Sequence, residues 1–433
     1  MMQRNILKTL TVLLTALLPL MAGCTSDMEG NDVEVKGKDV NPVGKIEVPV
    51  TPGVVELTDS QRQMVAQGND FSFRLLQTVN KEKKGSYVFS PISVGYVLGM
   101  VNNAADERSR KEIMQVLGFN DATPQAVNDY FGNLLVNAPG LDENVTLEVA
   151  NAIFGNSALG IQFADNFTAL MQGYYQAGIE SLDFNDAVTA LGRINGWSNE
   201  KTHGMIPEIL TKIDPYAVTY LLNAVYFNAP WTSPFSEKTQ MESFYAADGT
   251  KQLPMMYTEE DLDYVERDGI KMISKPYAGG KFRMAVLLPA SGGPADGLVG
   301  KLTTKYWQQL LESMSEETVI ISMPTFNNET ELNLIPVMKA MGMTYTFDSG
   351  DFSAMLANAR EKARLGLLKQ KAAIEVSQEG TKAAAVTIGG ECFSANISTL
   401  HQKKYFHANS PFVYVLYEQT TGAIFFMGKF TGE

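Results

Sequence analysis

The chain has 433 residues, of which 45% are hydrophobic and 19% charged, a composition typical of a globular protein with a large core. Its formal charge of −13 is spread along the chain, and this argues against a nucleic-acid surface because phosphate binding needs clustered Lys and Arg. The two cysteines, Cys24 and Cys392, exclude a framework of several disulfides.

The amino terminus has the pattern of an export signal. A basic start precedes an apolar run from Thr9 to Met21, which is too short for a typical membrane span. The run ends in small residues before Cys24 and resembles a bacterial lipobox, although Met21 stands where that pattern favours Leu. We therefore expect residues 1–23 to be a lipoprotein signal peptide that is cleaved before a lipidated Cys24. An ordinary signal peptide followed by an accidental cysteine is the alternative.

This reading places the protein in a bacterial cell envelope, at the outer membrane, at the cell surface or on the periplasmic face. The segment 24–57 is polar, contains several Gly and Pro residues and has no sustained apolar pattern, so it predicts a flexible tether. Residues 58–433 contain no second tether, repeat or low-complexity break, and we expect them to form one domain.

Helices are predicted first along the domain. Apolar residues at helical spacing indicate a helix over 58–79, with Thr58 as a plausible cap. A short strand ending near Phe89 leads into a second helix that continues through Val101. A third, amphipathic helix over 109–117 is stopped by Gly118.

Strands dominate the second half of the sequence. Residues 218–227 are almost continuously apolar, which is typical of a central strand buried on both faces. Further strands are predicted at 281–289, 318–323, 373–377, 412–417 and 423–429. The fold class is therefore α+β, with large mixed sheets.

Enzyme motifs are missing from the sequence. The three histidines, His203, His401 and His407, belong to no recognisable hydrolase pattern, and there is no nucleophile elbow, HExxH, P-loop or dinucleotide fingerprint. With no Cys/His cluster, a structural zinc is not expected either. We expect no enzyme activity, cofactor or metal; a hydrolase that uses one of the histidines is a weak alternative.

The segment 378–411 leaves about 30 residues without a clear element, a length uncommon in compact domains unless the loop is functional or disordered. Composition alone favours a floppy surface loop or a short Ala-rich helix over 381–387.

Motifs at many separated places, however, resemble the serpin family, and they occur in the family's order over residues 58–433. They are Phe89-Ser90-Pro91 with Ser93; Asn195, Trp197, Thr202, Gly204 and Ile206; Asn223 to Phe227 with Trp231 and Phe235; 319–326; 341–343; 351–353; and the closing blocks 406–412 and 421–429. The resemblance implies a serpin fold, with about nine helices around three mixed β-sheets and an exposed reactive-centre loop.

It also implies a suicide inhibitor of serine-type endopeptidases. A protease attacks the loop and forms an acyl-enzyme, and the cut loop then inserts into the main sheet and traps the protease. The implied shutter and breach residues are Ser90, Ser93, Asn223, Trp231 and Gln370. The implied hinge and insertion residues are Gln378, Glu379, Gly380, Thr381, Ala383, Ala384, Ala385 and Thr387.

Two of these positions depart from the family pattern. Gln378 stands where the family usually has Glu, and Gln370 stands where it has a histidine. Glutamine both donates and accepts hydrogen bonds, so Gln370 is able to replace that histidine.

Insertion places demands on the side chains of the loop. Alternate residues of a strand face opposite sides, and from Thr381 to Thr387 one face carries only Thr and Ala. Such small side chains enter a sheet with little overpacking. This pattern favours an inhibitor over a non-inhibitory serpin acting as a binding or carrier protein, which is the alternative.

The scissile bond depends on how the loop is counted. Family spacing from the hinge gives Ser394–Ala395, with Phe393–Ser394 one step away, whereas counting back from Pro411 points to Leu400. Ser394 suits elastase- or subtilisin-like proteases and Phe393 suits chymotrypsin-like ones; a cysteine protease is a further option. We expect a monomer that contacts the membrane only through Cys24.

Overall fold

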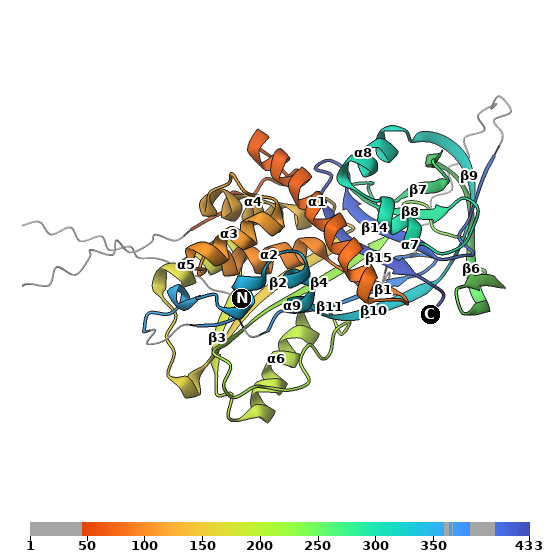
Figure 1. Ribbon diagram of the computed structural model, residues 1–433. Coiled ribbons are helices and arrows are strands. Elements are labelled where there is room, and N and C mark those ends of the chain that lie inside the picture. The colour runs from red at the N-terminus through yellow and green to blue at the C-terminus, as the bar shows by residue number, and fades with distance from the viewer. Residues whose placement is uncertain (1–45, 359–362, 366, 382–402) are drawn as a thin grey trace, which may run out of the picture. The chain divides into compact units, whose positions relative to one another are not determined.

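The computed structural model describes residues 46–358, 363–365, 367–381 and 403–433 (Figure 1). The helices α1–α10 cluster in two stretches of the chain. They are α1 (Asp59–Glu82), α2 (Pro91–Asn102), α3 (Glu107–Leu117), α4 (Pro124–Asn137), α5 (Asp165–Tyr175), α6 (Ala187–Lys201), α7 (Asp296–Lys301), α8 (Thr304–Glu312), α9 (Leu334–Ala340) and α10 (Thr344–Asp348), with single 3₁₀ turns at Ala138–Gly140, Ser157–Leu159 and Ser353–Met355.

The first helices begin and end where local chemistry requires. Thr58 and Gln61 form a capping box at the start of α1, which satisfies two backbone donors at once. Ser90 caps α2 ahead of Pro91, whose missing N–H would be unpaired in the first turn anyway. Gly118 ends α3 at φ 83°, a left-handed conformation that glycine adopts without strain.

Six strands form the sheet that contains the predicted hinge residues Gly380 and Thr381. In spatial order they are β10 (Phe326–Asn333), β11 (Lys369–Val376), β12 (Gly380–Thr381), β4 (Thr219–Pro230), β2 (Thr146–Asn156) and β3 (Gly178–Leu182). The sheet is mixed, because β2 pairs with β3 in parallel and with β4 antiparallel. Helix α6 packs against β2 and β4, and α2 packs between β4 and β15.

The remaining nine strands form a second hydrogen-bonded sheet. Its order is β1 (Tyr87–Phe89), β15 (Ile424–Phe430), β14 (Phe412–Glu418), β8 (Phe282–Pro289), β7 (Ile270–Pro276), β6 (Gly249–Arg267), β9 (Ser315–Pro324) and β13 (Lys404–His407), with β5 (Gln240–Ala246) paired to β6. The third sheet that the resemblance implies is not separate among the described residues. The 19-residue strand β6 pairs with β5 and β9 along one part and with β7 along another, and so joins the two halves.

Part of the predicted tether is packed against the domain. Asn137 accepts a hydrogen bond from the Thr51 backbone at 2.7 Å and donates to the Pro49 carbonyl at 3.1 Å. Val55 is buried, and Ile46 lies against α5 where Gly173 leaves space for it. Residues 46–57 therefore differ from the free tether expected there, because asparagine side chains on α4 satisfy an extended backbone that carries no repeating pattern of its own.

No helix in the described part of the chain combines the length and the apolar character needed to cross a membrane.

Candidate functional site at the hinge

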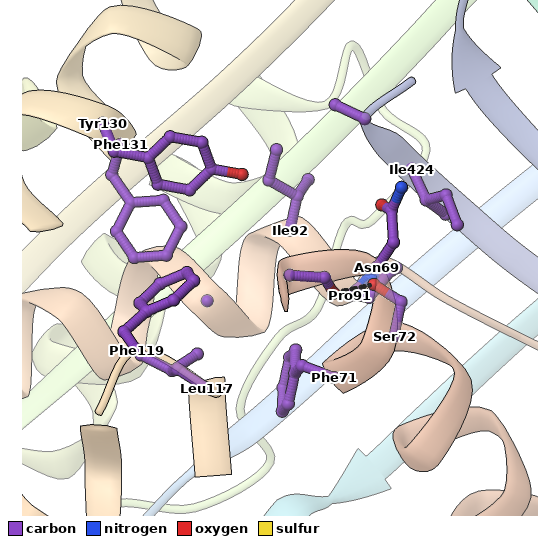
Figure 2. A pocket seen from close by; sticks show the side chains of 13 residues that line it. Asn69, Phe71, Ser72, Pro91, Ile92, Leu117, Phe119, Tyr130, Phe131 and Ile424 are labelled. Carbon is purple, nitrogen blue, oxygen red and sulfur yellow. Dashed lines mark hydrogen bonds between the residues drawn. The ribbon is translucent and has the colours of Figure 1, made fainter. Parts of the chain in front are cut away.

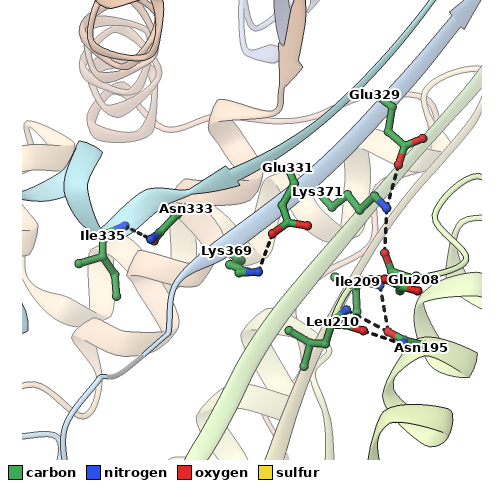
Figure 3. Close-up of polar contacts among 10 residues, drawn as sticks. All are labelled: Asn195, Glu208, Ile209, Leu210, Glu329, Glu331, Asn333, Ile335, Lys369 and Lys371. Carbon is green, nitrogen blue, oxygen red and sulfur yellow. Dashed lines mark hydrogen bonds and ion pairs between the residues drawn. The ribbon is translucent and has the colours of Figure 1, made fainter. Parts of the chain in front are cut away.

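The predicted hinge lies in the six-stranded sheet, between β11 and β4. Gly380 and Thr381 form β12, which pairs antiparallel with both neighbours: Thr381 faces Val376 of β11 and Ala229 of β4. Beyond β12, β4 and β11 lie next to each other (Figure 3). We call the space between β4 and β11 the slot. β12 occupies one end of the slot, between β11 and β4.

Gly380 and Thr381 fit the slot for different reasons. A Cβ atom at Gly380 would lie 2.2 Å from the Ala229 carbonyl oxygen and 2.7 Å from the Pro230 Cα, so only glycine lets the two backbones approach this closely. The Thr381 side chain points into the protein, is 1% exposed and hydrogen-bonds the Tyr277 hydroxyl. Burial raises the pKa of Tyr277 above its usual value, so the hydroxyl stays neutral and available to this bond.

The segment after β4 holds the hinge from the other side. The Trp231 backbone N–H donates to the Glu379 carbonyl at 2.8 Å, and the Phe235 N–H donates to the Gln378 carbonyl at 2.9 Å. The Trp231 indole Nε1 donates to the Ser377 carbonyl at 3.0 Å. Three consecutive carbonyls of the hinge are thus bound by one segment, 231–235, which we call the hinge platform.

The predicted shutter residues form two hydrogen-bonded pairs between the start of α2 and the sheet. Gln370 accepts from the Ser90 backbone N–H at 3.0 Å and donates to the Ser90 carbonyl at 2.8 Å. Gln370 therefore uses both functions of its amide, and it is 5% exposed. Ser93 donates to the Asn223 side chain of β4, which in turn donates to Asn151 of β2 at 2.8 Å.

The linker between α6 and β4 is joined to β11 by one lysine side chain (Figure 3). Lys371 of β11 donates to the Glu208 backbone carbonyl of this linker at 3.0 Å and forms an ion pair with Glu329 of β10 at 2.8 Å. Asn195 of α6 accepts from the Leu210 N–H at 3.0 Å and donates to its carbonyl at 2.8 Å, which ties the linker back to its helix. Lys371 thus connects β11 to the segment that precedes β4.

Comparisons with known proteins agree with this geometry. A sequence model of the family described as "Serpin (serine protease inhibitor)" matches residues 66–432. The chain belongs to the serpin family. It is 30% identical to Serpin B6 of Pongo abelii, over 85% of this chain and 99% of that protein.

Solved serpin structures resemble the chain over most of its length. The crystal structure of the thermophilic serpin tengpin in the native state is similar with a TM-score of 0.78 and 26% identity, covering 90% of this chain and 98% of tengpin. Human thyroxine-binding globulin, solved in complex with thyroxine, has a TM-score of 0.76 and 23% identity over 86% of this chain and 98% of that chain. The expected serpin fold and α+β class are confirmed, and serpins are in general protease inhibitors rather than enzymes.

Several predicted site residues of this serpin lie outside the described part of the chain. They are the insertion residues Ala383, Ala384, Ala385 and Thr387, the residues of the scissile-bond alternatives (Phe393, Ser394, Ala395 and Leu400), and Cys24. The structure therefore places the hinge, the hinge platform and the shutter, and the scissile bond stays a prediction.

A small pocket of this serpin lies between α1, α2, α4 and β15 (Figure 2). Phe119, Tyr130 and Phe131 form one side of it, and it shares no lining residue with the hinge. Only about 20 Å³ is open to the centre of a water molecule, which is room for roughly one water. This pocket gives no support to a carrier function.

Four residues of the site were not anticipated from the sequence. Lys275 of β7 is buried beneath the hinge platform against Glu260 of β6, and Tyr277 and Asn151 bond residues that were predicted. The sequence holds a signal for two of them. Lys275 and Asn151 are polar residues inside largely apolar strands, and polar groups are buried only where they have partners.

Proposed function

We propose that this serpin is a suicide-substrate inhibitor of serine-type endopeptidases. The observation that carries the proposal is the seating of β12. Its two residues are antiparallel to β11 and to β4, so a strand that continued from Thr381 would meet antiparallel partners on both sides. The small side chains after Thr381 in the sequence suit such a strand.

The chemistry belongs to the attacking protease. Its serine hydroxyl adds to the carbonyl of the scissile bond, the peptide bond breaks with release of the new amino terminus, and an ester joins serpin and protease. Insertion of the cut loop then competes with hydrolysis of this ester by water. Completed insertion keeps the ester, whereas hydrolysis frees the protease and leaves a cleaved serpin.

The proposal is tested by incubating the purified protein with elastase-, chymotrypsin- and subtilisin-like proteases and separating the products on a denaturing gel. We expect a covalent complex with the summed mass of protease and cleaved serpin with at least one of them. Cleavage products alone, with all three enzymes, would contradict the proposal.

Two variants of the same design sharpen this test. Thr381→Arg puts a charged side chain at a buried position of the slot, so the variant should be cleaved without forming the complex. Thr250→Arg makes the same substitution at an exposed position of β6, away from the hinge, and should still form the complex.

We also propose that Cys24 is acylated and anchors the protein to a bacterial envelope membrane. The lipobox-like ending of residues 1–23 supports acylation of Cys24. Acyl chains would anchor the protein because each buried methylene contributes roughly 0.8 kcal/mol to membrane binding. A labelled fatty acid supplied to expressing cells should appear on the wild-type protein and be lost in Cys24→Ser; equal labelling of both would contradict the anchor.

A further inference from the structure

A buried cation lies directly beneath the hinge platform. Lys275 is in β7, and its side chain is 1% exposed. Its ammonium group donates to the Ser233 carbonyl at 2.7 Å and forms an ion pair with Glu260 of β6, which is 12% exposed. Burial lowers the pKa of Lys275, and the neighbouring carboxylate opposes that shift.

The same ammonium group also contacts two rings of the platform. Its nitrogen lies 5.5 Å from the centre of the Trp231 ring and 4.8 Å from that of Phe235, within the range of cation–π attraction. Trp231 and Phe235 are the first and last residues of the segment 231–235, and Ser233 is its middle residue. One cation therefore contacts both ends and the middle of the platform.

The residues held by Lys275 are the ones that bind the hinge. The backbone N–H groups of Trp231 and Phe235 bind the carbonyls of Glu379 and Gln378. A buried ion pair is weak evidence for stability, because desolvation of both charges offsets their attraction. It does favour one orientation, since the ammonium group donates to both the carboxylate and the Ser233 carbonyl and loses one of these bonds if the platform moves.

We infer that Lys275, paired with Glu260, is a positioning residue that keeps the hinge platform in the geometry needed to start loop insertion. The inference rests on the proposed inhibitory function. A loosened platform would delay the first step of insertion, and water would hydrolyse more of the ester before the loop is in place. Lys275 would thus set how many serpin molecules are consumed for each protease trapped.

The test separates attack on the loop from the fate of the ester. Lys275→Met keeps the length of the side chain without its charge, and Glu260→Gln removes the other charge. Both variants should be attacked at the wild-type rate, because the loop is unchanged. They should consume at least about twice as many serpin molecules for each protease trapped. A factor of about two corresponds to the smallest interaction free energy usually measured between residues in contact.

Two further variants guard against a merely structural effect. The double variant Lys275→Met/Glu260→Gln leaves no unpaired buried charge, so it should fold. Its increase in serpin consumed per protease trapped should be smaller than the product of the increases in the two single variants. Glu259→Gln is the matched control: it is the adjacent residue, paired to Lys403 across an exposed 2.5 Å contact, and it should behave as the wild type.

Wild-type consumption in Lys275→Met, Glu260→Gln and the double variant would overturn the inference while leaving the inhibitory function intact. If the wild type traps no protease, the proposed function has failed, and hydrogen exchange then tests the platform directly. Faster exchange at the Trp231 and Phe235 amides in the double variant would support the inference, and unchanged exchange would overturn it.

Discussion

Gly380 shows at the residue scale how little space the hinge has. Its missing side chain leaves the backbone in contact with Ala229 and Pro230, and both would clash with a Cβ atom through backbone atoms that cannot move aside. We predict that Gly380→Ala disfavours the seated hinge by about 1–3 kcal/mol, the usual cost of overpacking. The measured result should be faster hydrogen exchange at 379–381 and less protease trapped per serpin.

Gly297 in α7 offers a control of the same chemistry. A Cβ atom there would meet nothing within 4 Å, and its backbone needs no positive φ, so Gly297→Ala should leave hinge exchange and trapping unchanged. If Gly380→Ala also behaved as the wild type, β12 would not be the start of insertion.

At the scale of elements, the sequence predicts what local chemistry decides. The helix cap at Thr58, the helix stop at Gly118 and the continuous apolar run of β4 each involve neighbours in the chain, and the structure confirms all three. Buried strands such as β14 and β15 were also predicted within about one residue, because burial on both faces leaves an unbroken apolar pattern.

The elements that the sequence does not predict depend on distant partners. In β6, polar and apolar residues do not alternate regularly, because different parts of this strand pair with β5, β7 and β9. The sequence predicts a tether over 46–57 because the segment has no local apolar pattern. Its backbone hydrogen bonds go instead to Asn133 and Asn137 on α4, about 80 positions later.

The same division holds within the site. Ser90, Ser93, Asn223, Trp231 and the hinge were inferred from motifs of the family, and the structure brings Gln370 to Ser90 across 280 positions. Lys275 and Glu260 are 15 residues apart, in β7 and β6. They pair only because both strands point these side chains into the same buried region. No local pattern encodes that, so a buried lysine in a strand is only a hint.

At the scale of the whole molecule, the proposed function requires that the fold described here is not the most stable one. Insertion of about 15 residues between β4 and β11 would give each new backbone group a partner, at a net gain of about 1 kcal/mol per hydrogen bond. Unfolding raises the entropy of the chain by roughly 2 cal/mol/K per residue. Dividing the gain in stability by this total entropy gives a rise in melting temperature of about 10 °C or more.

The measurement compares the melting of intact and loop-cleaved protein by circular dichroism. Thr381→Arg supplies the internal control, because a charged side chain at the mouth of the slot should let cleavage occur without insertion, and its melting temperature should then stay near the intact value. A wild-type protein that melts at the same temperature before and after cleavage would not gain a strand, and the non-inhibitory alternative would then be the better reading of the same fold. A rise in the wild type that Thr381→Arg abolishes would locate the stored free energy in the slot that β12 already enters.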